Sequence, residues 1–193
     1  MSLRIGILGA GHVGGALGRL WAAKGHDIQF GKRGSSNGEA AASAQVVVLT
    51  VPWPAAQDAI KDCGDLAGKI LVDCTNPLTP DLKGLSVGLT TSAAEQVALW
   101  APGAKVVKAF NTIGAVDFGN ADFGGVVADG FYCGDDDASK KVVAALISDT
   151  GMNPVDIGPL RNARLLEPLA LLWIDLAVIQ KQGPNHAFKL LRR

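Results

Sequence analysis

Short apolar runs alternate with amphipathic stretches along the whole chain of 193 residues. The clearest run, 46–51, is continuous and β-branched, which is typical of a strand covered on both faces. Glycine, proline and capping residues separate these runs from stretches of helical periodicity. The pattern predicts strands over 4–9, 27–30, 46–51, 69–73, 105–110, 125–133 and 154–157. It predicts helices over 13–24, 55–63, 92–100, 139–150 and 161–182.

The alternation of strand and helix predicts an α/β fold, a Rossmann-type doubly wound sheet that is mostly parallel. Ligands of such folds bind at the carboxyl ends of the strands, near the point where the strand order reverses. We expect residues 1–158 to form one dinucleotide-binding domain, because no repeat or linker interrupts the pattern. Residues 159–193 are then a short helical extension that completes the site and contributes a dimer interface.

The closing segment is dense in Leu, Ala, Ile and Trp between residues 165 and 179. It is too short to span about 30 Å of hydrocarbon, and it contains Glu167, Pro168 and Asp175. A helix that is apolar on most sides is buried in a core or against a second subunit. We therefore expect no membrane partner.

Composition excludes several classes of function. The formal net charge is +0, which argues against a nucleic-acid partner, because phosphate backbones are held by clustered cations. The three cysteines have no metal-ligand or disulfide spacing, so we expect buried free thiols in a reducing compartment. The run 135–137 of aspartates is better explained by helix capping than by a metal. Because the first residues enter an apolar strand without a signal peptide, a cytoplasmic protein is expected.

Gly9, Gly11 and Gly14 form a complete G-x-G-x-x-G pattern between a predicted strand and a predicted helix. In that context Gly9 makes the tight turn, Gly11 lets a pyrophosphate approach the backbone, and Gly14 packs helix against strand. His12 and Val13 occupy the variable positions, where contact with the pyrophosphate and simple exposure are both open. The motif predicts a bound dinucleotide; a glycine-rich turn without a ligand is the alternative.

The end of the second strand indicates which dinucleotide is bound. NAD-binding proteins carry an acidic residue there, which accepts the ribose 2′-hydroxyl. This chain has Lys32, Arg33 and Ser35 instead, and its next carboxylate is Glu39. Two cations and the hydroxyls of Ser35 and Ser36 suit a 2′-phosphate, which Arg33 can bind through two hydrogen bonds. NADP(H) is therefore predicted, with an exposed basic turn as the alternative.

Further candidate cofactor contacts follow the third, fourth and fifth predicted strands. Their carboxyl ends meet at the ligand edge of the sheet, although proline and asparagine are also ordinary turn residues. The candidates are Val51, Pro52, Trp53, Asn76, Pro77, Asn111 and Thr112.

The glycine motif, the run 31–33 and the run 50–53 resemble the NADP-dependent reductases of coenzyme F420. The segments 133–143 and 158–167 follow the pattern of that family more closely still. The run 108–112 is similar to the reductase domain of the STEAP metalloreductases, a related branch. The resemblance covers nearly the whole chain.

The resemblance implies a homodimeric NADP oxidoreductase that passes a hydride between nicotinamide and a deazaflavin (coenzyme F420) or flavin. Such a transfer requires alignment and exclusion of water more than a catalytic acid or base, and we assign no catalytic residue. The three histidines have no evident partner in the sequence. The resemblance implies a second-substrate pocket that includes Ile113, Arg164 and Pro168.

The chain also departs from that family. The resemblance leads us to expect a histidine at Asn111 and hydroxyl side chains at Pro168 and Ala170, whereas Arg164 and Glu167 are kept. The departures therefore concern the second substrate rather than NADP(H).

Two other functions remain open from the sequence. A reductase of a small carbonyl or imine substrate would share the N-terminal fold, but such enzymes add a large helical domain, and only 159–193 follow the sheet here. A binding protein that senses NADP(H) without turnover would also lack an acid–base residue.

Overall fold

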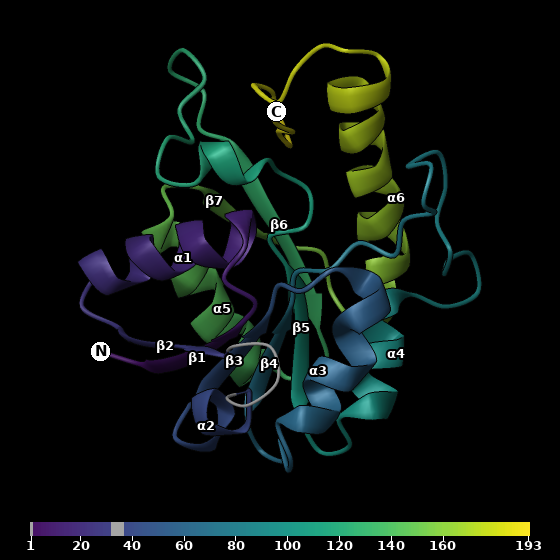
Figure 1. The fold of residues 1–193 in the computed structure, drawn as a ribbon. Helices are drawn as coiled ribbons and strands as arrows, with labels where there is room; N and C mark the ends of the chain where they lie inside the picture. The colour runs from purple at the N-terminus through teal and green to yellow at the C-terminus, as the bar shows by residue number, and fades with distance from the viewer. Residues whose placement is uncertain (1, 32–36) are drawn as a thin grey trace.

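The computed structural model describes residues 2–31 and 37–193. Seven strands form one sheet in the order β2-β1-β3-β4-β5-β6-β7, and only the β5–β6 pair is antiparallel (Figure 1). The strands are β1 (Arg4–Leu8), β2 (Asp27–Gly31), β3 (Val46–Leu49), β4 (Ile70–Asp73), β5 (Lys105–Ala109), β6 (Asp129–Gly134) and β7 (Asn153–Asp156). The predicted α/β class with a mostly parallel sheet is confirmed.

Helices cover both faces of the sheet (Figure 1). On one face α1 (His12–Ala23) and α5 (Asp137–Asp149) pack on a core that contains Leu17, Trp21 and Leu146. The other face is covered by α2 (Asn37–Ala42), α3 (Ala56–Asp62), α4 (Ala93–Trp100) and α6 (Ala163–Ile174). The doubly wound arrangement predicted from the alternating pattern is therefore present.

The strand order reverses between β1 and β3, because β2 lies on one side of β1 and β3 on the other. The Thr50 hydroxyl, which follows β3, is within hydrogen-bond distance of two carbonyl oxygens at the end of β1. It lies 2.9 Å from that of Leu8 and 2.7 Å from that of Gly9. In open α/β sheets this reversal marks the place where ligands bind.

Three elements differ from the sequence prediction. The strand predicted over 125–133 begins at Asp129, and 122–127 form an irregular turn closed by a single bridge. The short helix α2 has too few residues to show a helical periodicity, and the pattern did not predict it. The predicted helix 161–182 ends earlier: α6 passes into a π turn (Asp175–Ile179), and Lys181 then takes a φ of +57°.

After α6 the chain returns over β6 (Figure 1). The buried Asp129 carboxylate accepts hydrogen bonds from the Lys189 ammonium (2.6 Å) and the Leu190 amide (2.7 Å). The Trp173 indole donates to the His186 carbonyl (2.8 Å), and the two rings stack at 4.8 Å. These contacts attach the last residues to the sheet domain.

Two of the three histidines have partners in the structure that are not evident from the sequence. His26 lies 3.1 Å from Asp149 and accepts a hydrogen bond from the Leu3 amide. His186 stacks on Trp173. Both contacts join segments distant in sequence, which a local pattern does not reveal.

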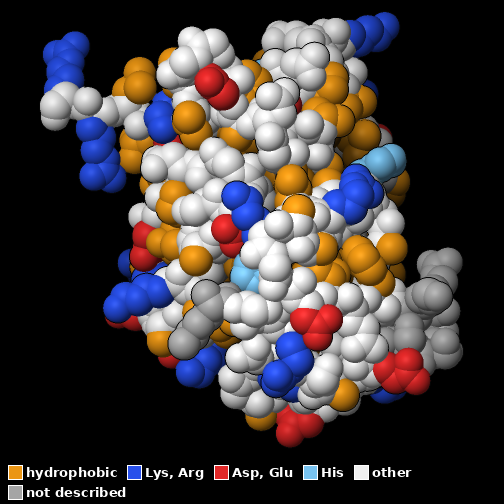
Figure 2. Space-filling model, turned by 90° about the vertical axis from the view of Figure 1, so that its left-hand side faces the viewer, with side chains coloured by type: hydrophobic (Ala, Val, Ile, Leu, Met, Phe, Trp, Pro, Cys, Tyr) orange, Lys and Arg blue, Asp and Glu red, His pale blue; other side chains and the backbone are white. Residues whose placement is uncertain are grey.

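On the face that Figure 2 shows, basic, acidic and apolar side chains are interspersed rather than gathered into separate fields.

Within residues 2–31 and 37–193, no helix has both the length and the apolar character required to cross a bilayer. The same residues contain no cluster of three or more metal-ligating side chains. Asp136 caps α5 by accepting a hydrogen bond from the Ser139 amide (2.8 Å).

Candidate functional site

The three glycines of the G-x-G-x-x-G motif form the turn between β1 and α1. Gly9 has a φ of +105°, which L side chains rarely adopt. A Cβ on Gly14 would lie 2.0 Å from the Gly9 carbonyl oxygen, so only glycine lets the helix approach the strand this closely. At Gly11, by contrast, no heavy atom of the described residues lies within 4 Å of the Cβ position, apart from Gly11 itself and its two chain neighbours. The space over Gly11 is therefore open to a ligand.

Helix α1 begins at this turn and presents its first backbone amides there. Gly11 is the N-cap, and no side chain of the described part of the chain caps the helix. The first turn contains no acidic residue. Free amides and the positive end of the helix dipole are a suitable site for a phosphate group.

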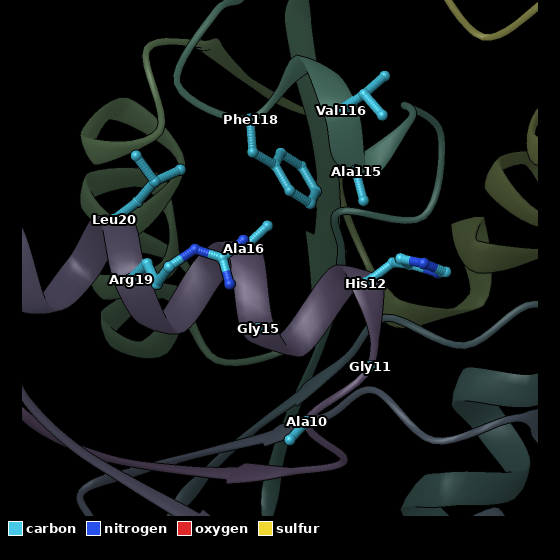
Figure 3. A pocket seen from close by; sticks show the side chains of 10 residues that line it. All are labelled: Ala10, Gly11, His12, Gly15, Ala16, Arg19, Leu20, Ala115, Val116 and Phe118. Carbon is cyan, nitrogen blue, oxygen red and sulfur yellow. The ribbon is translucent and has the colours of Figure 1, made fainter.

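Two hollows flank the glycine turn and meet at Ala10, which lines both. The hollow on the β2 side has a volume of about 620 Å³ and is lined by Gly9, Gly31, Val51 and Pro52, with Asp58 and Asp62 of α3. The other, of about 700 Å³, lies between α1 and the segment after β5. Figure 3 shows Phe118 pointing toward α1 across this second hollow, while His12 extends from the start of the helix.

The residues predicted to select NADP(H), Lys32, Arg33 and Ser35, lie outside the described residues. Gly31, directly before them, and Asn37, directly after Ser36, both line the β2-side hollow. The preference for NADP(H) stays a prediction. The sequence reasoning did not foresee Asp58 and Asp62 in this hollow, because their approach depends on how α3 packs.

The residues of the turn after β3 lie in two different places, the hollow and the protein core. Val51 and Pro52 line the β2-side hollow. Trp53 instead stacks on Trp100 of α4 at a centroid distance of 5.1 Å and is half-buried. The Trp53 ring therefore contributes to packing between α3 and α4, and its contact with a cofactor stays a prediction.

The predicted residues at the ends of β4 and β5 do come together. Asn76 donates to the Asn111 carbonyl (3.1 Å), and the Asn111 side-chain amide donates to the Asn76 side-chain oxygen (3.1 Å). The Asn111 amide also donates to the Leu166 carbonyl of α6 (3.1 Å). Pro77, Thr112 and Ile113 are buried beside this pair. The Asn111 Oδ1 atom is buried and accepts no hydrogen bond from the described residues.

Phe110, directly before Asn111, has an unusual backbone. Its φ of +63° is rare for a bulky residue. The ring is held edge-on against Trp21 (5.6 Å) and Phe118 (5.9 Å). Backbone strain of this kind is found at functional sites, where packing maintains it.

Sequence reasoning missed a buried charge cluster below the asparagine pair. Lys108 of β5 is fully buried, and its Nζ lies 2.9 Å from Asp73 and 3.1 Å from Glu167. The same ammonium donates to the Thr75 carbonyl. The sequence did contain an indication of this cluster. Lys108 is a charged residue inside a predicted apolar strand, and because side chains alternate between the two faces of a strand, it lies on the same face as Val106.

The protonation of this cluster follows from burial and pairing. Burial alone would lower the pKa of the Lys108 ammonium, but the carboxylates of Asp73 and Glu167 outweigh burial and raise the pKa. Burial raises the pKa of the Glu167 carboxyl, while Lys108 and the Ala93 amide oppose that shift. Lys108 is therefore charged at neutral pH, and its ammonium lies within 3.1 Å of both acidic side chains.

The predicted second-substrate residues are only partly together. Arg164 and Pro168 of α6 line a hollow of about 900 Å³ with Leu85 and Leu89, whereas Ile113 lies elsewhere, at the end of β5. Arg164 also forms an ion pair with Glu95 of α4, with distances of 2.6 and 2.8 Å. Hydrogen bonding to Arg164 lowers the pKa of the Glu95 carboxyl.

Known proteins are similar to this chain in sequence and in fold. The family model described as NADP oxidoreductase coenzyme F420-dependent matches residues 29–77. The F420-dependent NADP reductase of Methanothermobacter marburgensis is 32% identical over 155 residues, which cover 76% of this chain and 68% of that protein. The metalloreductase STEAP3 of Rattus norvegicus is 30% identical over 187 residues, which cover 88% of this chain and 37% of the longer relative.

Among solved structures, one from Arthrobacter sp. FB24 described as a putative F420-dependent NADP reductase is similar to this chain over its full length. It is 30% identical, with a TM-score of 0.91, and the alignment covers 99% of this chain and 100% of that one. The resemblances identified from the sequence are confirmed by these comparisons.

Proposed function

Because the chain belongs to the family of F420-dependent NADP reductases, we propose that it transfers a hydride between NADP(H) and a deazaflavin, coenzyme F420, or a flavin. The observation that carries this proposal is the glycine turn at the reversal of strand order. There, free amides of α1 and the open space over Gly11 suit a pyrophosphate. NADP(H) supplies the hydride donor or acceptor, and the protein aligns the two rings and excludes water.

The residues divide the binding of NADP(H) between them. The backbone around Gly9, Gly11 and Gly14, with His12 and Val13, would hold the pyrophosphate. Val51, Pro52 and Trp53 would border the adenosine half, and Asn76, Pro77, Asn111 and Thr112 would border the nicotinamide half. Lys32, Arg33 and Ser35 would bind the 2′-phosphate, and Ile113, Arg164 and Pro168 would border the second substrate.

Oxidation of NADPH, followed by absorbance with coenzyme F420, FMN, FAD or riboflavin as acceptor, tests the reaction. The proposal expects turnover with at least one of these acceptors. If NADPH binds and none of them is reduced, the chain is an NADP(H)-binding sensor rather than an enzyme of this class.

Arg33→Ala is expected to weaken binding of NADP about 10- to 100-fold and to leave binding of NAD within about twofold. The lost interaction is a charge-assisted contact with the 2′-phosphate, which NAD does not carry. Titration calorimetry with both dinucleotides measures the change, and Arg192→Ala, which removes an exposed arginine, is the matched control. An unchanged ratio of the two affinities would refute the assignment of this turn.

We further propose that residues 159–193 complete the site and form the interface of a homodimer. Leu165 and Leu172 are 65% and 48% exposed, although they lie two turns apart on one side of α6. The opposite side of α6, which includes Leu166 and Ala170, faces the core. An exposed apolar stripe on a helix is typical of an interface.

The double change Leu165→Glu and Leu172→Glu is therefore expected to convert a dimer into a monomer, because it places charges in that interface. Light scattering coupled to size exclusion measures the mass. Leu191→Glu is the control, since Leu191 is 79% exposed and lies outside α6. A wild-type chain that is monomeric at micromolar concentration would contradict the proposal.

We also propose a cytoplasmic location, which the free thiols support. Cys63, Cys74 and Cys133 are unpaired and buried. Burial raises the pKa of Cys63 to about 11 and that of Cys133 to about 12, so these thiols are unreactive at neutral pH. Cell fractionation tests the location.

A further inference from the structure

The buried ammonium of Lys108 lies below the predicted nicotinamide side of the site. The Lys108 side chain has no exposed surface, and neither has the Asp73 carboxylate that it contacts. The third member of the cluster, Glu167, is 1% exposed. Removing three charges from water is costly, and such clusters contribute little net stability compared with apolar packing. Their retention needs a reason other than stability.

The contacts of the cluster connect the segments that present the two asparagines. Lys108 donates to the Thr75 carbonyl, and the next residue is Asn76. The Thr75 amide and hydroxyl in turn donate to Asp73, at 2.9 and 2.7 Å. Lys108 itself lies on β5, which ends at Ala109, and Asn111 follows two residues after that end. The ammonium therefore fixes the ends of β4 and β5 relative to each other.

The third contact brings α6 and α4 into the same arrangement. The Glu167 carboxylate accepts hydrogen bonds from the Ala93 and Ala94 amides at the start of α4, at 2.9 and 3.2 Å. The preceding residue, Leu166, supplies the carbonyl that accepts from the Asn111 amide. A shift of Glu167 would move this carbonyl and release Asn111.

The orientation of the Asn111 side chain is determined by these neighbours. Its Nδ2 donates to two oxygens, that of Asn76 and that of Leu166, so the amide cannot be reversed without losing both bonds. Oδ1 then faces away from both and is a buried acceptor without a partner in the described part of the chain. Asn111 is 6% exposed, and a buried acceptor of this kind is costly unless a ligand satisfies it.

We propose that Lys108 is a positioning residue, which holds the Asn76–Asn111 pair so that Asn111 Oδ1 accepts a hydrogen bond from the nicotinamide carboxamide. The carboxamide NH₂ is a donor, and the nicotinamide half of a dinucleotide extends from the strand reversal toward β4 and β5. The inference rests on the proposed function, because it assumes that the pyridine ring of NADP(H) lies at this edge of the sheet.

The test of Asn111 compares NADP with its 3-acetylpyridine analogue, which has a methyl ketone in place of the carboxamide and so lacks the donor. Asn111→Ala is expected to weaken binding of NADP about five- to tenfold and to leave binding of the analogue within about twofold. Equal effects on both ligands would overturn the role of Oδ1. This comparison measures affinity alone, so it remains decisive even if no acceptor is ever reduced.

The test of Lys108 uses the double variant Lys108→Met with Glu167→Gln. It removes one cation and one anion together, so the net charge of the cluster is unchanged. Lys105→Met is the matched control. Lys105 lies at the other end of the same strand, and its side chain is 44% exposed. If the double variant is poorly folded, Glu167→Gln alone, which keeps Lys108 and changes only the α6 contact, replaces it.

We expect the double variant to lose the discrimination between NADP and the analogue that the wild type shows. We also expect hydride transfer in a single turnover to be about 10- to 100-fold slower, since small misplacements of a reacting ring have effects of this size. A merely structural role would lower the melting temperature while leaving the discrimination and the rate per folded molecule within about twofold. That outcome would overturn the proposal, whereas failure of the wild type to reduce any acceptor would instead refute the proposed function.

Discussion

Replacing Gly11 with valine is expected to leave the fold intact and to weaken binding of NADPH by roughly 100-fold or more, because the pyrophosphate must approach this backbone closely. The backbone at Gly11 has φ −72° and ψ −161°, which any L residue can adopt. The Cβ position also has no neighbour within 4 Å among the residues described. The valine methyl groups would therefore occupy ligand space rather than protein space.

Fluorescence titration with NADPH and a thermal melt measure the two halves of this prediction. Gly14→Ala is the contrasting variant, since its Cβ would lie 2.0 Å from the Gly9 carbonyl oxygen and 2.5 Å from the Thr50 hydroxyl. We expect Gly14→Ala to reduce stability first and Gly11→Val to reduce affinity alone. Unchanged affinity in folded Gly11→Val would show that the dinucleotide does not cross this turn.

Lys108→Met is expected to lower the free energy of unfolding by about 3–5 kcal/mol at neutral pH, because it leaves two carboxylates unpaired in the core. The pH dependence has a definite sign. The pKa of Glu167 is already raised by burial, and without Lys108 it rises further. A carboxyl whose pKa is higher in the folded than in the unfolded state stabilises the fold at pH values below its unfolded-state pKa. This contribution is lost as the pH increases through its folded-state pKa.

The stability lost in Lys108→Met should therefore be smaller at about pH 5 than at about pH 8. Urea unfolding at both values measures it, with Lys105→Met as the control. Adding Glu167→Gln to Lys108→Met is expected to recover part of the loss, because one unpaired charge is removed. Equal losses at both pH values would contradict the view that the Lys108 ammonium compensates the buried carboxylate of Glu167.

The elements that depend on local sequence could be predicted. The apolar run 46–51 contains β3, which lies between β1 and β4, and the helix predicted over 92–100 corresponds to α4, which Ser92 caps. The glycine motif predicted both the turn and a separate role for each glycine, which the different surroundings of Gly9, Gly11 and Gly14 support. These features follow from backbone conformations that the residue types themselves favour.

Features that depend on contacts between distant segments could not be predicted. The resemblance implied that Arg164 borders the second substrate, and its pairing with Glu95 depends on how α6 packs against α4. Lys108 meets Asp73 and Glu167 only after the sheet and α6 are assembled. The positive φ of Phe110 is likewise maintained by the rings of Trp21 and Phe118 rather than by its own preference.

The most direct test of the proposed reaction uses NADPH that carries deuterium at C4 of its nicotinamide ring, with coenzyme F420 as acceptor in ordinary water. Direct hydride transfer places the deuterium on the ring carbon of the reduced deazaflavin when the labelled position, pro-R or pro-S, is the one that is transferred, and mass spectrometry detects it. We predict that one of the two labelled forms transfers its deuterium and that the other retains it. Oxidation of NADPH with no label in the reduced deazaflavin from either form would contradict direct hydride transfer, and no oxidation at all would exclude coenzyme F420 as the acceptor.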